Sequence, residues 1–210
     1  MEKKTVLITG ASSGIGEGCA RKFAMNGYRL ILNGRNVEKL NAVKDELEKK
    51  YGVEVWLLPF DVRDRAAARA ALYSLPEEWK AIDVLVNNAG LVIGVDKEHE
   101  GSLDEWDVVI DTNVKALLAM TRLVVPGMVE RGRGHVINMG SIAGDYAYAA
   151  TVSELGPVPE RHRLRGQAPP SPSSSPSAAE PERRVRRRAH LRALGALLVH
   201  ALITCYKFMP

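Results

Sequence analysis

Hydrophobic and polar positions follow two alternating periods along the first 140 residues. Short unbroken apolar runs, such as Val6–Ile8, are typical of strands buried on both faces of a parallel sheet. Between them, apolar residues recur every three or four positions, as Leu40, Val43 and Leu47 do, which predicts amphipathic helices. The pattern predicts strands over residues 5–8, 28–33, 53–60, 82–86 and 134–139. It predicts helices over residues 14–26, 37–50 and 64–75, and a long helix from residue 102 or 104 towards 129 with a break at Pro126.

Strand and helix alternate five times, which predicts an α/β fold with a doubly wound, parallel, Rossmann-type sheet and right-handed crossovers. The 210 residues suffice for one such domain with a sizeable core. Ligands of these sheets bind outside the carboxyl ends of the strands. Polar and glycine residues fall at all five of these ends, namely Thr9-Gly10, Gly34-Arg35, Asp61-Val62, Asn87–Gly90 and Asn138–Ser141.

Glycines between the first strand and the first helix indicate a phosphate-binding turn. A turn this tight needs residues without a Cβ, and a phosphate reaches the backbone only where side chains are absent. The helix that follows offers free N–H groups and a positive dipole end to a pyrophosphate. The glycine pattern alone also fits an ordinary βα turn, but the agreement of five strand ends favours a cofactor site. The predicted contacts are Gly10, Ser12, Ser13, Gly14, Ile15 and Gly16.

Three further segments are expected to hold the rest of a dinucleotide. Arg35 follows the second strand, where the adenosine ribose would lie, and its guanidinium suits a 2′-phosphate, so NADP is favoured over NAD. A solvated surface arginine is the alternative. Asp61, with Val62 beside it, is expected to accept a hydrogen bond from the adenine amino group or to cap the local turn. A cofactor ribose can pass close to the small segment after the fourth strand, Asn88, Ala89 and Gly90.

These motifs resemble those of the short-chain dehydrogenase/reductase family over residues 3–149. Thr9–Gly16 is similar to the family's cofactor loop, and Asn87–Gly90 is similar to its motif after the fourth strand. Glu105-Trp106 and Gly140–Gly144 most resemble the branch of NADP-dependent 3-hydroxy acid (serine-type) dehydrogenases. The resemblance implies hydride transfer between NADP(H) and a small 3-hydroxy acid or a related alcohol or ketone.

The resemblance also assigns two residues to the reaction. Ser141 matches the catalytic serine, which bonds the substrate oxygen, although a turn serine is the alternative. Asn113 matches a helix asparagine that holds a water in the proton relay, and a buried asparagine bonded to backbone is the alternative. The family's general acid is a Tyr whose pKa is lowered by a Lys four residues later. No Tyr or Lys occurs from Ala149 to Arg165, so we expect an impaired dehydrogenase or, alternatively, a protein that binds NADP(H) without catalysis.

The composition changes near Ala149–Ser153, which divides the chain into an NAD(P)-binding domain, residues 1–149, and a tail, residues 150–210. Residues 151–210 hold ten Lys and Arg against four Asp and Glu, and eight of the eleven prolines. Three interpretations of the tail are open. It is a basic segment that contacts nucleic acid or anionic lipid, a membrane anchor whose uninterrupted apolar part is short for a membrane span, or a segment translated in another reading frame. The last is favoured, so the tail is expected to be disordered or non-native, with neither nucleic acid nor membrane as a partner.

Loss of the family's remaining strands has consequences for folding. His135–Met139 is expected to be an exposed edge strand, and the face that the lost helix covers is expected to stand open. The family's homo-oligomer is therefore in doubt. Cys19 and Cys205 lack metal-ligand spacing and indicate a reducing compartment without disulfides. Because no apolar leader precedes the first strand, a cytoplasmic protein is expected.

Overall fold

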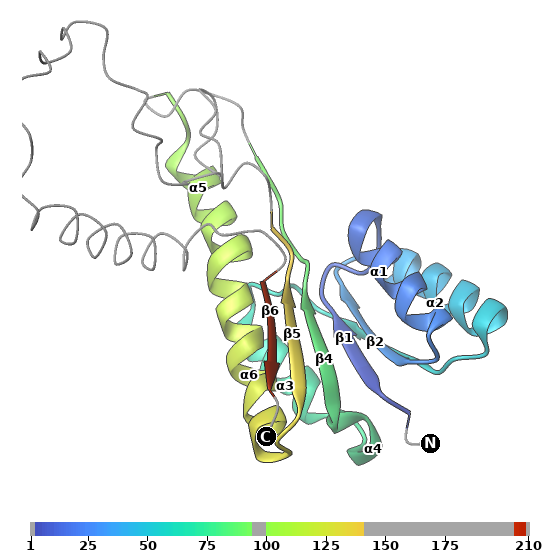
Figure 1. Cartoon of the computed structure of the whole chain (residues 1–210). Coiled ribbons are helices and arrows are strands. Elements are labelled where there is room, and N and C mark those ends of the chain that lie inside the picture. Colours follow the sequence, from blue (N-terminus) through green and yellow to red (C-terminus); the bar gives the residue numbers. More distant parts are fainter. Residues whose placement is uncertain (1–2, 94–99, 141–203, 209–210) are drawn as a thin grey trace, which may run out of the picture.

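The computed structural model describes residues 3–93, 100–140 and 204–208 of the chain. Strands and helices alternate from residue 5 to residue 138, as the sequence pattern predicts (Figure 1). The elements are β1 (Thr5–Ile8), α1 (Gly14–Met25), β2 (Arg29–Gly34), α2 (Val37–Tyr51), β3 (Val55–Pro59), α3 (Arg65–Tyr73), α4 (Glu77–Lys80), β4 (Ile82–Asn87), α5 (Leu103–Ile110), η1 (Asp111–Ala116), α6 (Leu117–Glu130), β5 (Gly134–Asn138) and β6 (Thr204–Phe208). The pattern did not predict α4, the π-helix η1 or β6.

The strands form one sheet in the order β3-β2-β1-β4-β5-β6. All pairs among β1 to β5 are parallel, which confirms the doubly wound, Rossmann-type architecture. The chain order reverses beside β1, because β2 and β3 lie on one side of it and β4 and β5 lie on the other. In open α/β sheets a ligand binds at this reversal, outside the carboxyl ends of the strands.

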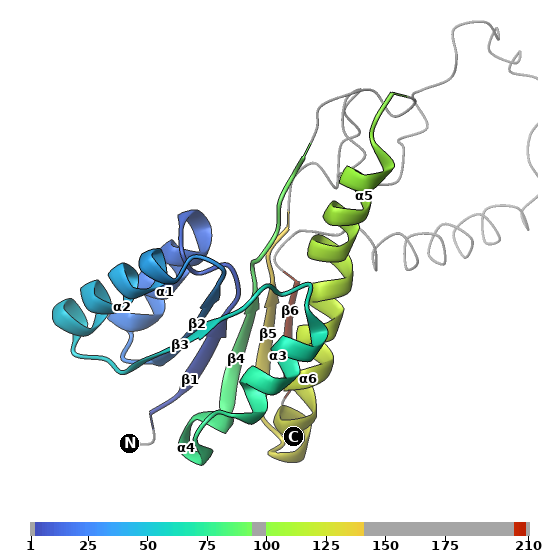
Figure 2. The ribbon, with the colours of Figure 1, turned by 180° about the vertical axis from the view of Figure 1, so that it is seen from behind.

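Two apolar cores cover the two faces of the sheet, because successive strand residues point to opposite faces. In β1, Leu7 packs in the core that includes residues of α3, α4 and α6, whereas Val6 and Ile8 pack with residues of α1 and α2. Figure 1 and its reverse view, Figure 2, show α1 and α2 over one face and α3 and α6 over the other. Burial of both faces explains why the strands read as nearly continuous apolar runs.

Side-chain caps set the starts of α2 and α3, and a glycine sets the end of α2. The side chain of Asn36 accepts a hydrogen bond from the Lys39 N–H at 2.8 Å, and Asp64 accepts from two N–H groups at the start of α3. These bonds satisfy first-turn donors that have no partner within the helix. Gly52 ends α2 at a φ of 64°, a conformation that costs glycine little because it has no Cβ.

The long helical segment after residue 102 differs from its prediction in two ways. The predicted break at Pro126 is wrong, because α6 runs through Pro126 to Glu130. Pro126 and Arg122 are both exposed, so the Arg122 carbonyl that loses its helical donor lies on the solvent side. Between α5 and α6, Asp111–Ala116 forms the π-helix η1, an irregularity that is frequent at functional sites. Figure 1 shows α5 leading into α6 as one continuous rod.

The sheet beyond β5 also differs from its prediction. Thr204–Phe208 pairs antiparallel with β5, with Phe208 opposite Gly134 and Thr204 opposite Asn138. The expectation that His135–Met139 is an exposed edge is therefore wrong. A strand in this position pairs with backbone groups of β5 that a free edge leaves open to other chains. The tail from residue 150 to 203 lies outside the described residues.

The outer face of α6 carries an open apolar surface. Leu118 and Val129 are 50% and 58% exposed, respectively. An open groove of about 540 Å³, almost entirely apolar, follows the helix between Leu118 and Glu130. Within the described ranges, no helix combines the length and the apolar character needed to cross a membrane.

Candidate functional site

A cavity of about 340 Å³ opens at the carboxyl ends of β1, β2, β3 and β4, where the strand order reverses. Ten of the twelve residues predicted to contact the cofactor line it: Gly10, Ser12, Ser13, Ile15, Arg35, Asp61, Val62, Asn88, Ala89 and Gly90. Five more residues line it that the sequence pattern did not assign to the site: Asn33, Gly34, Phe60, Leu91 and Thr112. The structure therefore brings most of the predicted contact residues together in one cavity, along with five that the sequence did not single out.

Gly14 and Gly16 are the two predicted residues that do not line the cavity, and they act on the backbone geometry of the turn. Gly14 has a φ of 59°, a left-handed conformation that side chains disfavour. A Cβ on Gly16 would lie 2.3 Å from the carbonyl oxygen of Gly10, so only glycine lets α1 pack this close to the end of β1. Both glycines act through backbone geometry and need not touch a ligand.

The N-terminus of α1 faces the cavity with open hydrogen-bond donors. Ser13 is the N-cap residue, yet its side chain makes no capping bond to the first turn. Ser13 and Ile15 both line the cavity and both are exposed. Glu17, the acidic residue of the first turn, is paired with Arg21, and Arg21 is also paired with Glu46 on α2. Glu17 does not line the cavity. The free N–H groups and the positive end of the helix dipole therefore make this end of the cavity suited to an anion.

Asn88 fastens the turn after β1 to the end of β4. Its Nδ2 donates to the carbonyl oxygens of Thr9 and Gly10 at 2.9 and 3.2 Å. The hydroxyl of Thr9 accepts from the N–H groups of Asn88 and Ala89, both at 3.0 Å. These four bonds hold the glycine turn against β4, so Asn88 positions the cavity wall in addition to lining it.

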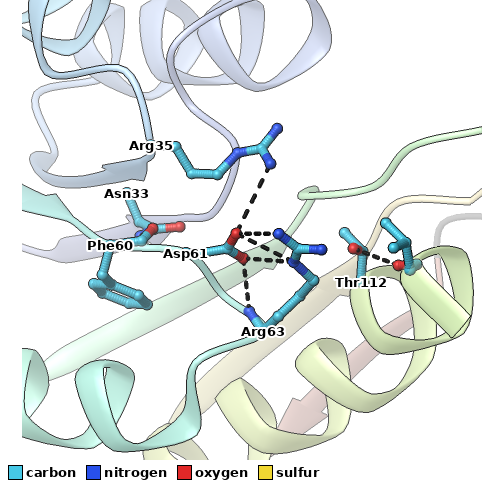
Figure 3. Close-up of polar contacts among 7 residues, drawn as sticks. Asn33, Arg35, Phe60, Asp61, Arg63 and Thr112 are labelled. Carbon is cyan, nitrogen blue, oxygen red and sulfur yellow. Dashed lines mark hydrogen bonds and ion pairs between the residues drawn. The ribbon is translucent and has the colours of Figure 1, made fainter. Parts of the chain in front are cut away.

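Asp61 lies between two arginines at the end of β3 (Figure 3). The guanidinium of Arg63 donates to both carboxylate oxygens, at 2.7 to 3.1 Å, and the Arg63 backbone N–H donates to Oδ1 at 3.0 Å. Arg35 Nη1 lies 3.8 Å from Asp61 Oδ2, which is an ion pair without a close hydrogen bond. The turn-capping role considered for Asp61 is thus observed. Hydrogen bonds from Arg63 hold the pKa of Asp61 below its ordinary value.

Arg35 extends from the end of β2 with little to hold its guanidinium. Its side chain is 66% exposed, and the distant pair with Asp61 leaves most of its five donors turned outwards. The planar fork of donors suits bidentate recognition of a phosphate. The cavity therefore has two features suited to an anion, the α1 N-terminus and Arg35.

Asn113 lies within the π-helix η1 and pairs with the chain just beyond Gly90. Its Oδ1 accepts from the Leu91 N–H at 2.9 Å, and its Nδ2 donates to the Leu91 carbonyl at 2.8 Å. This is the backbone-bonded arrangement considered as the alternative for Asn113. Both side-chain atoms are therefore engaged with the backbone of Leu91, and the predicted role of Asn113 in a proton relay stays a prediction.

Ser141 falls outside the described residues, so its predicted contact with substrate stays a prediction. The described residues contain no group of His, Cys, Asp and Glu arranged to hold a metal ion. The five additional lining residues had weak sequence signals. Asn33 was detectable in principle, since a buried strand that otherwise carries apolar residues rarely contains a fully buried amide without a purpose.

Comparison with known proteins agrees with this geometry. Residues 4–153 match the family described as short chain dehydrogenase. The NADP-dependent 3-hydroxy acid dehydrogenase YdfG of Salmonella typhi is 53% identical over 144 residues, which are 69% of this chain and 56% of the relative. Serine dehydrogenase from Escherichia coli has a similar structure, with a TM-score of 0.65 and 50% identity over 69% of this chain and 65% of that chain.

A second structure of serine dehydrogenase, a closed form complexed with NADP+, has the same TM-score of 0.65 and covers 69% of this chain and 57% of its own. The chain spans about half the length of the curated relatives it matches. The matched part contains the parallel sheet from β1 to β5, the glycine turn and the cavity. By this match, over well above half of its length, the chain belongs to the short-chain dehydrogenase/reductase family.

Proposed function

We propose that the domain of residues 1–149 binds NADP(H) in the cavity at the carboxyl ends of β1 to β4. The observation that carries the proposal is that the open N-terminus of α1 and the guanidinium of Arg35 lie at one cavity. A pyrophosphate fits the first position and a 2′-phosphate fits the second. NADP dependence in the similar dehydrogenase and NADP+ in the similar structure support this choice over NAD.

The chain's own residues divide the binding work along the cavity. The glycine turn and the N–H groups near Ser13 and Ile15 hold the pyrophosphate, and Arg35 holds the 2′-phosphate. Asp61 and Val62 face the adenine, where the carboxylate accepts from the amino group. Asn88, Ala89 and Gly90 lie beside the ribose on the nicotinamide side, and the nicotinamide supplies or accepts the hydride when bound.

Titration calorimetry with NADPH and NADH tests the proposal on the full chain. We expect NADPH to bind at least about tenfold more tightly, because each charge-assisted contact to phosphate is worth about 1.5–3 kcal/mol. Equal affinity for the two cofactors would remove Arg35 from its assigned role. Absence of binding by either cofactor would refute the proposed function.

We further propose that the parent reaction, oxidation of a small 3-hydroxy acid or reduction of the matching 3-oxo acid, is impaired in this chain. The names of the similar dehydrogenases suggest this substrate class. Ser141 is present, but no Tyr with a Lys four residues later follows it between Ala149 and Arg165. Loss of a general acid costs about 10²–10⁴-fold in rate, so catalysis is expected to be far below the usual range.

A steady-state assay with NADPH and a panel of 3-oxo acids, and with NADP+ and serine, tests the impairment. Turnover within the ordinary enzyme range of about 1–10³ s⁻¹ would contradict it. The control is an equal concentration of a variant that cannot bind cofactor. Binding without measurable turnover would support a non-catalytic NADP(H)-binding protein, which we propose to act in the cytoplasm.

A further inference from the structure

We propose that Arg63 is a specificity-determining residue for the cofactor, because it holds the carboxylate of Asp61 and thereby leaves Arg35 free to bind the 2′-phosphate of NADP(H). The inference rests on the proposed NADP(H) binding and adds a reason for the preference over NAD(H). Arg63 is not among the residues that line the cavity. It is therefore a positioning residue, which acts through Asp61 without touching the ligand.

Two arginines compete for one oxygen of Asp61 (Figure 3). Arg63 Nη2 lies 2.7 Å from Asp61 Oδ2, and Arg35 Nη1 lies 3.8 Å from the same atom. The first distance is that of a hydrogen bond, whereas the second lies beyond hydrogen-bond reach. Asp61 therefore has Arg63 as its bonded partner, and Arg35 is held only by the attraction between the two charges.

Arg63 has the advantage in this competition because it belongs to the same turn as Asp61. Its Nε lies 3.1 Å from both carboxylate oxygens, and its backbone N–H donates to Oδ1 at 3.0 Å. Together with the bond from Nη2, these contacts use most of the roughly four lone-pair sites of an ionised carboxylate. The side-chain hydrogen bond from Arg63 is the largest cause that lowers the pKa of Asp61, and the charge of Arg35 is the smallest.

The carboxylate of Asp111 does not offer Arg63 an equal alternative. The hydrogen bond to Asp61 is the largest cause that raises the pKa of Arg63, and the charge of Asp111 is the smallest. Asp111 is itself paired with Lys115 at 2.7 Å. Arg63 therefore stays with Asp61, and the negative charge of Asp61 is balanced without the help of Arg35.

The charge balance at Asp61 decides what Arg35 can bind. A carboxylate and a phosphate are rival acceptors for the donor fork of one guanidinium. Without Arg63, the Asp61 carboxylate would draw the exposed Arg35 side chain to itself and would also repel a 2′-phosphate bound beside it. NAD(H) carries no 2′-phosphate, so its binding does not depend on this competition. Arg63 therefore acts on the preference between the two cofactors.

A double-mutant cycle between Arg63 and Asp61 tests the inference. Calorimetry on the full chain gives the ratio of NADPH to NADH affinity for the wild type, Arg63→Gln, Asp61→Asn and the double variant. Contacts to the adenine and the pyrophosphate are common to both cofactors and cancel in this ratio. We expect Arg63→Gln to lower the ratio about 2–5-fold, the value of one partly exposed ion pair. In the Asp61→Asn background, no carboxylate competes for Arg35, so the same substitution should leave the ratio unchanged.

Two further variants separate positioning from a general effect of charge. Arg65→Gln removes the same charge from an exposed position, two residues further along, that does not line the cavity. It should keep the wild-type ratio. Arg63→Lys keeps the charge and a hydrogen-bond donor for Asp61, so its ratio should stay closer to that of the wild type than the ratio of Arg63→Gln does. Thermal unfolding of each variant verifies that folded proteins are compared.

An unchanged ratio in Arg63→Gln would overturn the inference while leaving the proposed function intact. The same fall of the ratio in both Asp61 backgrounds, or an equal fall in Arg65→Gln, would show that the charge alone acts, and this too would overturn it. So would a ratio for Arg63→Lys as low as that of Arg63→Gln. Failure of the wild-type chain to bind NADPH at all would overturn both the inference and the proposed function.

Discussion

Arg63 holds the carboxylate of Asp61 at the mouth of the cavity, two residues along the same chain. The guanidinium reaches both carboxylate oxygens, and the backbone N–H adds a third contact. These bonds lower the pKa of Asp61 and raise that of Arg63. The acceptor that the adenine is proposed to meet is thus both fixed in place and kept ionised.

Substitution of Arg63 by glutamine should release Asp61. Because the folded-state pKa of Asp61 is lowered, its contribution to stability is present above the unfolded value of about 3.9 and is lost as pH falls through the folded value. We expect Arg63→Gln to destabilise by about 0.5–1 kcal/mol at pH 7, since the pair is partly exposed. The difference from wild type should shrink as the pH falls below the unfolded value. Urea unfolding at pH 7 and at successively lower pH values measures it, and a difference that does not change with pH would contradict this origin.

Arg35 should discriminate between the two nicotinamide cofactors. Arg35→Leu removes the guanidinium from the exposed end of β2 while leaving the glycine turn untouched. We expect NADPH to bind about 10–100-fold more weakly and NADH to change less than about threefold. Arg69→Leu, an exposed arginine on α3 away from the cavity, is the control for general loss of positive charge. Equal weakening of both cofactors would place Arg35 outside the phosphate site.

The same discrimination should depend on pH. A phosphate monoester has a second pKa of about 6, so a 2′-phosphate loses one negative charge as pH falls through that value. Asp61 stays ionised over this range because its pKa is lowered. The ratio of NADPH to NADH affinity should therefore fall between pH 8 and pH 5, with the NADH affinity nearly constant. A ratio independent of pH would argue against recognition of the phosphate charge.

Two glycines of α1 offer a direct comparison of packing and propensity. A Cβ on Gly16 would lie 2.3 Å from the Gly10 carbonyl oxygen, whereas a Cβ on Gly18 meets nothing within 4 Å. Gly16→Ala should cost about 1–3 kcal/mol and abolish cofactor binding, since the turn must move. Gly18→Ala should stabilise the chain by about 0.5–1 kcal/mol, because alanine favours the helix. Thermal unfolding with NADPH titration distinguishes them, and similar behaviour of both variants would refute the steric argument.

Much of the fold was predictable because it follows from local chemistry. The hydrophobic periods of β1 and α2 follow from the faces that these two elements bury. Asn36 and Asp64 cap helix starts and Gly52 ends a helix, and each acts on backbone groups within a few residues. The cavity was predictable for the same reason, since parallel strands bring their carboxyl ends to one edge. Arg35 and Asp61 could be placed there without knowing any side-chain geometry.

Some of the features that escaped prediction depend on contacts between distant segments, and others have no local signal. Thr204–Phe208 carries no local signal that it pairs with β5, some 70 residues earlier. The π-helix around Asn113 has no sequence signature of its own. The buried amide of Asn33 donates to the carbonyls of Leu58 and Phe60, 25 and 27 residues later. Pro126 breaks no helix, because its lost bond lies on the solvent side.

The pairing of β6 with β5 gives the last prediction. Deletion of residues 204–210 removes β6 and leaves the backbone groups on the outer side of β5 open to other chains. Together with the exposed Leu118 and Val129 on α6, this edge should promote self-association. We expect the free energy of unfolding to fall by at least about 1 kcal/mol, the net value of one hydrogen bond, and light scattering at equal concentration to rise. Deletion of residues 209–210 alone is the control, because it leaves β6 intact. If both deletions leave stability and scattering at the wild-type level, β6 does not protect this edge in solution, and His135–Met139 is the open strand that the sequence first suggested.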